Sequence, residues 1–179
     1  MDKPPLVKNV KKNMISKPER IIKRIIKAIG QRQSVLAIGD WDESIIKGIR
    51  DNQNSITVET CHGMSLQSDN SFTRIIADYN PPLTTDFFLE ARRMLLPTGM
   101  VIISANCELN IFEKLFNNKK EENIKKIKPK VLQDQIHDNG FLIDGYYGYP
   151  GGDLLMMAEI QNKDVTTLFA SDRQETIAK

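Results

Sequence analysis

The sequence has few side chains that bind metal ions or form disulfides. Its 179 residues include only two cysteines, Cys61 and Cys107, and two histidines, with no CxxC pair. A structural zinc site or a disulfide framework needs more ligands or more cysteines at set spacings. We therefore expect no metal site and two reduced thiols.

Long apolar runs are absent as well. A membrane-spanning helix needs about 20 consecutive apolar residues, and no run in this chain approaches that length. The N-terminus carries Lys and Arg without the apolar core and small-residue cleavage site of a secretory signal. The composition, 40% hydrophobic and 27% charged, is ordinary for a globular protein. These features predict one folded domain in the cytoplasm with no transmembrane segment.

Charge is abundant but unevenly placed. Residues 1–28 hold nine of the 25 Lys and Arg and two of the 23 Asp and Glu, a net charge of +7 against about −5 for the remainder. Such a segment suits an anionic partner or a protein partner, and it equally suits a solvated arm. We divide the chain into a basic flexible arm (1–15), a folded domain (16–161) and a C-terminal tail (162–179).

Hydrophobic periodicity predicts alternating helices and strands. Ser16 and Glu19 have the spacing of a capping box before a helix whose isoleucines share one face and which Gly30 ends. Apolar runs bounded by turn residues predict strands. A second helix is expected to follow the possible caps at 40–43 and to run to about residue 51, and further helices are expected at 85–95, 108–116 and 131–139. Strands are expected at 35–39, 56–60, 72–78, 100–104, 141–147 and 154–160. This order predicts an α/β fold with a mostly parallel sheet and a C-terminal antiparallel hairpin.

Four segments, in this order, resemble the class I methyltransferases that use S-adenosylmethionine (SAM). They are 35–39 (VLAIG), 63–72 (GMSLQSDNSF), 88–104 (FLEARRMLLPTGMVIIS) and 139–141 (NGF) with the final hairpin. The resemblance implies a Rossmann-like methyltransferase fold, in which the turn after the 35–39 strand would hold SAM.

The chain departs from the family pattern at that turn. Ala37 stands where the family has an acidic residue, and Gly39 is followed by Asp40, Trp41 and Asp42 where the family has further glycines. Side chains there obstruct the close backbone approach that the cofactor needs. We expect SAM binding to be weak or absent. The two aspartates fit helix caps better than contacts to the cationic groups of SAM, and Trp41 fits the core better than a stacking platform.

The ribose contact of the family is uncertain in this chain. Matching 56–60 to the family's third strand implies that one strand-helix unit is missing, and with it the carboxylate that holds the ribose. Alternatively Glu59, twenty residues after Gly39, has the spacing of such a carboxylate. We favour the deletion.

The candidate catalytic residues are Asp78, which ends the 72–78 strand, and Tyr79 and Asn80, which follow it. Asn80 begins an Asn-Pro-Pro sequence that resembles the acceptor motif of nitrogen methyltransferases, although Leu83 replaces the motif's aromatic residue. A structural turn is the better interpretation. Together these observations predict a binding, scaffold or regulatory module with a degenerate SAM site. The alternative is an active SAM-dependent methyltransferase acting on a small molecule or nucleic acid.

Overall fold

The structure, a computed structural model, describes residues 17–39, 41–51, 58–61, 67–80, 82–108, 126–149 and 152–161, with the backbone alone for 58–61. The expected arm (1–15), the expected tail (162–179) and, apart from Glu108, the expected helix at 108–116 lie outside the described residues.

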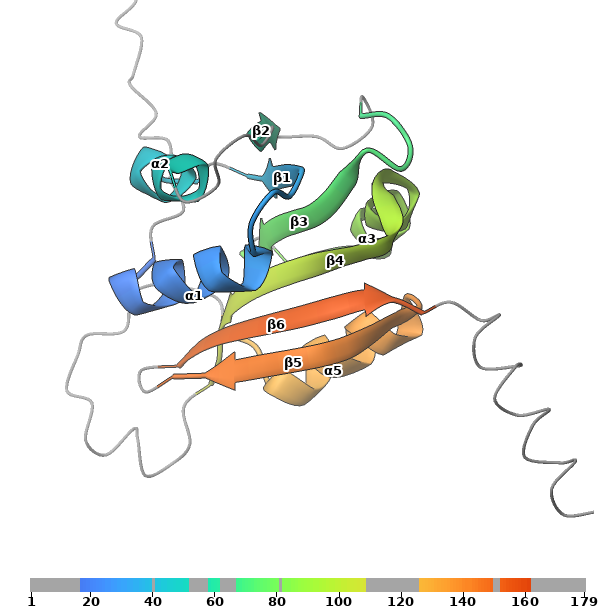
Figure 1. Ribbon diagram of the computed structural model, residues 1–179. Coiled ribbons are helices and arrows are strands. Elements are labelled where there is room, and N and C mark those ends of the chain that lie inside the picture. The colour runs from blue at the N-terminus through green and yellow to red at the C-terminus, as the bar shows by residue number, and fades with distance from the viewer. Residues whose placement is uncertain are drawn as a thin grey trace, which may run out of the picture.

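The described strands form one six-stranded sheet in the order β2-β1-β3-β4-β6-β5 (Figure 1). Strands β2, β1, β3 and β4 run parallel, whereas β6 is antiparallel to both of its neighbours, β4 and β5. This is the predicted parallel sheet with a C-terminal hairpin. The strands are β1 (Val35–Ile38), β2 (Val58–Cys61), β3 (Phe72–Asp78), β4 (Leu95–Asn106), β5 (Phe141–Gly148) and β6 (Asp153–Ile160).

Helices cover both faces of the sheet, because the buried strands carry apolar side chains on both sides. Helices α1 (Glu19–Ile29) and α2 (Glu43–Asp51) lie on one face, and α3 (Thr85–Met94) and α5 (Pro129–Asp138) lie on the other (Figure 1). Each pair closes its own hydrophobic cluster against the sheet. No helix in the described part of the chain is long and apolar enough to cross a membrane.

Helix α1 confirms the predicted isoleucine stripe but not the capping box. Ile21, Ile25 and Ile29 are buried, and Gly30 ends the helix with a φ of 77°. The N-cap residue is Pro18, which makes no side-chain capping hydrogen bond, and Ser16 lies outside the described residues. The carbonyl of Pro18 accepts the first helical hydrogen bonds, from the N–H groups of Ile21 and Ile22. The helix therefore starts directly after Pro18.

Strand β4 is longer than the predicted strand at 100–104 because it starts directly after α3. Leu95 pairs with Phe72, and the next pair joins Met100 to Arg74. The register shift accommodates residues 96–99 as an irregularity within the strand. The Pro97-Thr98-Gly99 sequence, predicted to be a turn, therefore lies inside the strand boundaries.

Candidate functional site

The carboxyl ends of β1, β3 and β4 meet at one edge of the sheet, where open α/β folds place their ligands. Strand β6 starts at the same edge, since Asp153 pairs with Asn106 at the end of β4. Helix α1 begins there too, because Arg20 in its first turn donates to Asp153 Oδ2 over 3.1 Å. We call this region the carboxyl edge.

A buried ion pair lies at the carboxyl edge. Lys17 Nζ is 2.6 Å from Asp78 Oδ2, and the side chains are only 6% and 5% exposed. The other oxygen, Asp78 Oδ1, accepts the backbone N–H of Asn80 over 3.1 Å. Both carboxylate oxygens are therefore engaged, so Asp78 cannot act as a base toward a ligand unless Lys17 moves away.

Ser104 adds an unsatisfied hydroxyl beside this pair. It is opposite Asp78 in the β3–β4 register and is 2% exposed. Its Oγ has no hydrogen-bond partner among the described residues. A buried polar group without a partner is costly. Three polar side chains thus gather under the start of α1: a cation, a carboxylate and a free hydroxyl.

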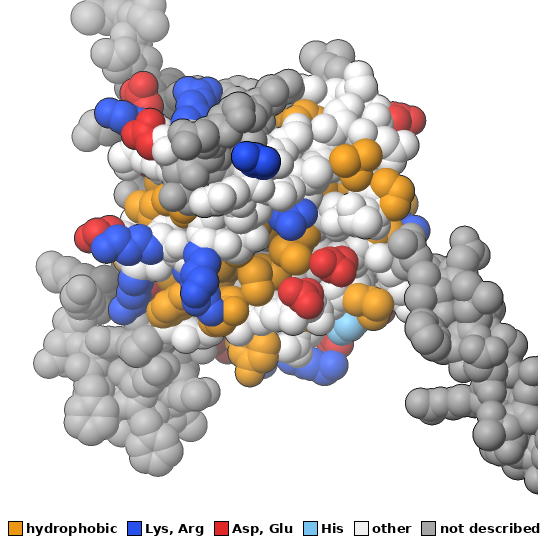
Figure 2. All heavy atoms as spheres, viewed as in Figure 1, with side chains coloured by type: hydrophobic (Ala, Val, Ile, Leu, Met, Phe, Trp, Pro, Cys, Tyr) orange, Lys and Arg blue, Asp and Glu red, His pale blue; other side chains and the backbone are white. Residues whose placement is uncertain are grey.

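Two arginines of α1 contact the C-terminal hairpin. The Arg24 guanidinium lies 3.4 Å from the ring centroid of Tyr147, and that of Arg20 lies 5.6 Å from the ring centroid of Tyr149. Figure 2 shows Lys and Arg side chains gathered over α1 and α2, beside hydrophobic ones. Cations over aromatic faces are attracted by the ring quadrupole. These two cation–π contacts therefore help to hold α1 against the C-terminal hairpin of the sheet.

Two described side chains of the turn between β1 and α2, those of Trp41 and Asp42, are engaged within the protein. Gly39 has a φ of 106°, which favours glycine. Trp41 is 7% exposed, packs in the cluster under α1 and α2, and donates from Nε1 to the carbonyl of Ile38 over 3.0 Å. Asp42 Oδ1 accepts the N–H of Ser44 over 2.8 Å, which confirms it as a cap of α2. Asp40 lies outside the described residues.

The other candidate catalytic residues, Tyr79 and Asn80, directly follow β3. Tyr79 is buried, its N–H donates to the carbonyl of Ser104 over 2.8 Å, and burial raises the pKa of its phenol. Asn80 is exposed, and Pro81 falls outside the described residues. The carbonyl of Leu83 accepts from Gln135 on α5 over 2.9 Å. This hydrogen bond joins the segment after β3 to α5.

Glu59 lies on the strand next to β1, where it pairs with Leu36. Only residues 62–71 separate β2 from β3. Nothing is described of the Glu59 side chain, so the alternative that it serves as a ribose carboxylate stays untested, as does the favoured deletion.

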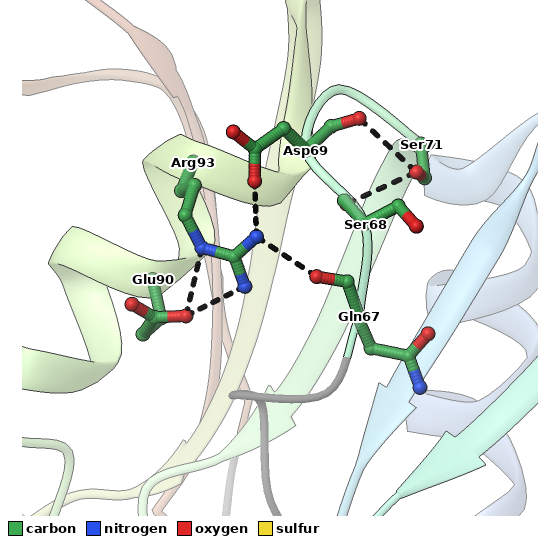
Figure 3. Close-up of polar contacts among 6 residues, drawn as sticks. All are labelled: Gln67, Ser68, Asp69, Ser71, Glu90 and Arg93. Carbon is green, nitrogen blue, oxygen red and sulfur yellow. Dashed lines mark hydrogen bonds and ion pairs between the residues drawn. The ribbon is translucent and has the colours of Figure 1, made fainter.

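A polar network of six residues lies at the other end of β3, away from the carboxyl edge (Figure 3). Arg93 on α3 donates to Glu90 Oε2 over 3.0 and 2.8 Å and to the carbonyl of Gln67 over 2.8 Å, and it contacts Asp69. These contacts hold residues 67–71 against the last turn of α3. No cluster of metal-binding side chains occurs within the described ranges.

Asp78 lies at the sheet edge that the sequence predicts for it. Lys17 and Ser104 were not predicted to lie at this edge. Asp78 ends an evident strand, so the topology alone locates it. Lys17 belongs to a run of similar cations in the sequence, and its contact spans 61 positions along the chain. No local pattern marks such a contact.

The structure, unlike the sequence, has recognisable relatives. No family model and no curated protein matches the sequence. The Burkholderia thailandensis 1,6-didemethyltoxoflavin-N1-methyltransferase, solved with S-adenosylhomocysteine, superposes with a TM-score of 0.62 at 12% identity, covering 80% of this chain and 78% of that one. An Aquifex aeolicus SAM-dependent methyltransferase gives 0.60 at 12% identity, covering 80% and 94%. The glycopeptide N-methyltransferase MtfA, complexed with sinefungin, gives 0.53 at 12%, covering 78% and 92%.

The chain has a class I methyltransferase-like fold. At 12% identity the likeness shows the fold alone. Within this fold the Lys17–Asp78 pair lies beside the turn after β1, because Gly39 and Asp78 each follow directly on the paired residues Ile38 and Ala77.

Proposed function

We propose that this methyltransferase-fold chain is a binding or regulatory module whose SAM site is degenerate. The observation that carries the proposal is the Lys17–Asp78 pair, buried at the carboxyl edge beside Gly39. The packing of Trp41 under α1 and α2 supports it, since Trp41 belongs to the core and Asp42 caps a helix.

A nucleotide that binds at the carboxyl edge would do so at the expense of the Lys17–Asp78 contact. Breaking a buried ion pair by removing one partner costs about 3–5 kcal/mol. A ligand that leaves Asp78 unpaired must repay that cost from its own binding energy. Even 3 kcal/mol weakens a dissociation constant by more than about a hundredfold. SAM binding at the micromolar level is therefore not expected.

Titration calorimetry of the full chain with SAM and with S-adenosylhomocysteine tests the proposal. We expect no saturable heat with either nucleotide at concentrations up to about 1 mM. Thermal unfolding at the same concentrations is expected to show no rise in the melting temperature. An established SAM-dependent methyltransferase run in the same buffer controls for ligand quality. A dissociation constant tighter than about 100 μM would overturn the proposal, because ligand in excess would then stabilise the folded state measurably.

The second candidate is an active SAM-dependent methyltransferase for a small molecule or nucleic acid. One observation favours it: Gly39 keeps the positive φ that permits close backbone approach to a cofactor. In this case Lys17 would leave Asp78 when the substrates bind. Transfer of labelled methyl groups from SAM to a mixed acceptor pool, lost in Asp78→Asn, would establish it.

A partner that binds through the basic N-terminal segment fits the regulatory proposal. The net charge of +7 in residues 1–28 suits an anionic partner. Some of this charge already has partners within the protein, which disfavours a nucleic-acid partner. The contacts are Arg20 with Asp153, Lys23 with Glu19 and Arg24 with Tyr147. Binding to mixed RNA or DNA that weakens steeply with salt and disappears when residues 1–15 are deleted would identify a nucleic-acid partner. Salt-insensitive binding would exclude it.

A further inference from the structure

The helices on the two faces of the sheet carry opposite net charges. Helices α1 and α2 together contain six Lys or Arg and three Asp or Glu, a net charge of +3. Helices α3 and α5, on the other face, contain three Lys or Arg and four Asp or Glu, a net charge of −1. An asymmetry of this kind orients a protein in an external field of negative charge. We call the outward-facing side of α1 and α2 the α1–α2 surface.

Two lysines of the α1–α2 surface have charges that no described residue balances. Lys27 lies in the last turn of α1, Lys47 lies in the middle of α2, and both are exposed. Neither makes a hydrogen bond, an ion pair or a ring contact within the described part of the chain. On the other face, by contrast, Lys130 of α5 lies 2.6 Å from Asp134. The ammonium groups of Lys27 and Lys47 are therefore available to an external anion.

Helical geometry turns both lysines away from the sheet. Each lies two positions from a buried isoleucine on either side, and two positions correspond to about 200° around a helix axis. The isoleucines are Ile25 and Ile29 on α1, and Ile45 and Ile49 on α2. Because α1 and α2 cover the same face of the sheet (Figure 1), Lys27 and Lys47 point to the same side of the molecule.

Partly buried isoleucines lie on the α1 flank that meets α2. Ile22 and Ile26 are partly exposed and pack against the cluster under the two helices. A Cβ added to Gly48 would lie 3.3 Å from Ile26 Cδ1, so α2 approaches α1 along this flank. Figure 2 shows hydrophobic side chains beside Lys and Arg side chains over these helices. Lysines that border apolar side chains suit the interface of an anionic bilayer, which offers negative headgroups above an apolar layer.

We propose that the α1–α2 surface binds an anionic lipid bilayer, with Lys27 and Lys47 against the lipid headgroups. A bilayer attracts cations through its surface potential and needs no defined hydrogen-bond geometry. A nucleic acid is better matched by arginine, and the arginines of α1 already contact Asp153 and Tyr147. The proposal deepens the partner role proposed above and rests on it, since it names the anionic partner and the surface that meets it.

Vesicle flotation with the full chain tests the proposal. One set of vesicles is phosphatidylcholine with about 30% phosphatidylserine, and the other is phosphatidylcholine alone. We expect binding to the anionic vesicles only, and we expect it to weaken when sodium chloride is raised from about 0.1 M to about 0.5 M. Each basic residue near an anionic surface strengthens binding about fivefold, so Lys27→Gln combined with Lys47→Gln should weaken it about 25-fold.

Two controls separate the α1–α2 surface from the charge of the whole chain. Lys128→Gln combined with Lys130→Gln removes two exposed lysines at the start of α5, on the opposite face. This variant has the same net charge as the first and is expected to bind like the wild type. Deletion of residues 1–15, which contain four Lys and one Asp, is expected to leave binding that still depends on Lys27 and Lys47.

The proposal is overturned if the chain does not bind anionic vesicles, or binds both kinds of vesicle equally. It is also overturned if the two pairs of lysine substitutions weaken binding equally, or if deletion of residues 1–15 abolishes it. Stronger binding to mixed RNA than to anionic vesicles at equal phosphate concentration would assign the surface to a nucleic acid instead. Tight SAM binding by the wild type would overturn only the degenerate-site proposal, because the vesicle assay contains no SAM.

Discussion

The Lys17–Asp78 pair combines two opposed energies. Taking both charges out of water is costly, and their attraction in a low-dielectric interior offsets the cost only while both are present. With side chains 6% and 5% exposed, neither charge would be solvated by water if its partner were removed. A substitution at either residue is therefore expected to affect the stability of the fold strongly.

Removing one partner of this pair should destabilise the fold strongly. We predict that Lys17→Met lowers the free energy of unfolding by about 3–5 kcal/mol, because Asp78 is left as an unpaired buried charge. Urea denaturation measures the change. Lys17→Met combined with Asp78→Leu should recover most of the loss, since no charge is then buried. Lys23→Met should change stability little, because its partner Glu19 is exposed.

Cys107 offers a second test at the residue scale. Burial, together with the nearby Asp153, raises the pKa of its thiol from 9.0 to about 11. A thiol with a raised pKa in the folded state stabilises the fold below its unfolded pKa, and this contribution is lost as the pH rises through the folded pKa. We predict that stability falls between about pH 9 and 11, measured by urea denaturation. The fall should be smaller in Cys107→Ala, and equal falls would contradict the assigned cause.

Which residues could be predicted from the sequence depended on how local their signals were. Asp42 follows a strand and precedes a helix, so its capping role is read from neighbouring residues, and the structure confirms it. The Pro18 start of α1 was missed because a capping-box spacing at Ser16 competes with it. Lys17 and Ser104 gained their roles only when β3, β4 and α1 came together, which no short sequence pattern records.

At the scale of elements, hydrophobic period and turn residues predicted the strands well where both faces are buried. Strand β3 has the predicted limits, and β1 differs from its prediction by one residue. Strand β4 was underestimated because Pro97 and Gly99 are normally read as turn residues. Here the register shift between Phe72 and Arg74 absorbs them. Tertiary pairing with β3 thus overrides the local signal.

The network around Arg93 couples two elements and gives a prediction at this scale. The amide groups of Asn70 and Ser71 donate to the carbonyls of Arg93 and Met94, over 3.0 and 2.8 Å. We predict that Arg93→Lys accelerates hydrogen exchange at Asn70 and Ser71 several-fold, because lysine cannot contact Glu90 and Gln67 together as a guanidinium does. Amide exchange followed by NMR measures the effect.

Arg92 supplies the matched control for that experiment. It is the neighbouring, exposed residue of α3, and it contacts the carbonyl of Asn139 over 3.4 Å rather than the 67–71 segment. Arg92→Lys should leave exchange at Asn70 and Ser71 unchanged. Equal acceleration in both variants would mean that the effect comes from the helix and not from the network.

At the scale of the whole molecule, two hydrophobic clusters share one sheet. The cluster with α1 and α2 includes Trp41, and the cluster with α3 and α5 includes Phe88 and Phe141. Strands β1, β3, β4 and β6 contribute side chains to both clusters, on alternate positions. Neither cluster can lose its packing without disturbing the strands that support the other.

This shared sheet predicts a single cooperative unfolding transition. Trp41, the one tryptophan of the chain, reports the α1–α2 cluster through its fluorescence, because the indole is buried there. Far-ultraviolet circular dichroism reports all helices and strands. We expect urea transitions from the two signals to coincide in midpoint and slope, as in a two-state domain. An earlier fluorescence transition would show that α1 and α2 detach first. It would also show that the Lys17–Asp78 contact is lost before the sheet unfolds, because Lys17 leads directly into α1.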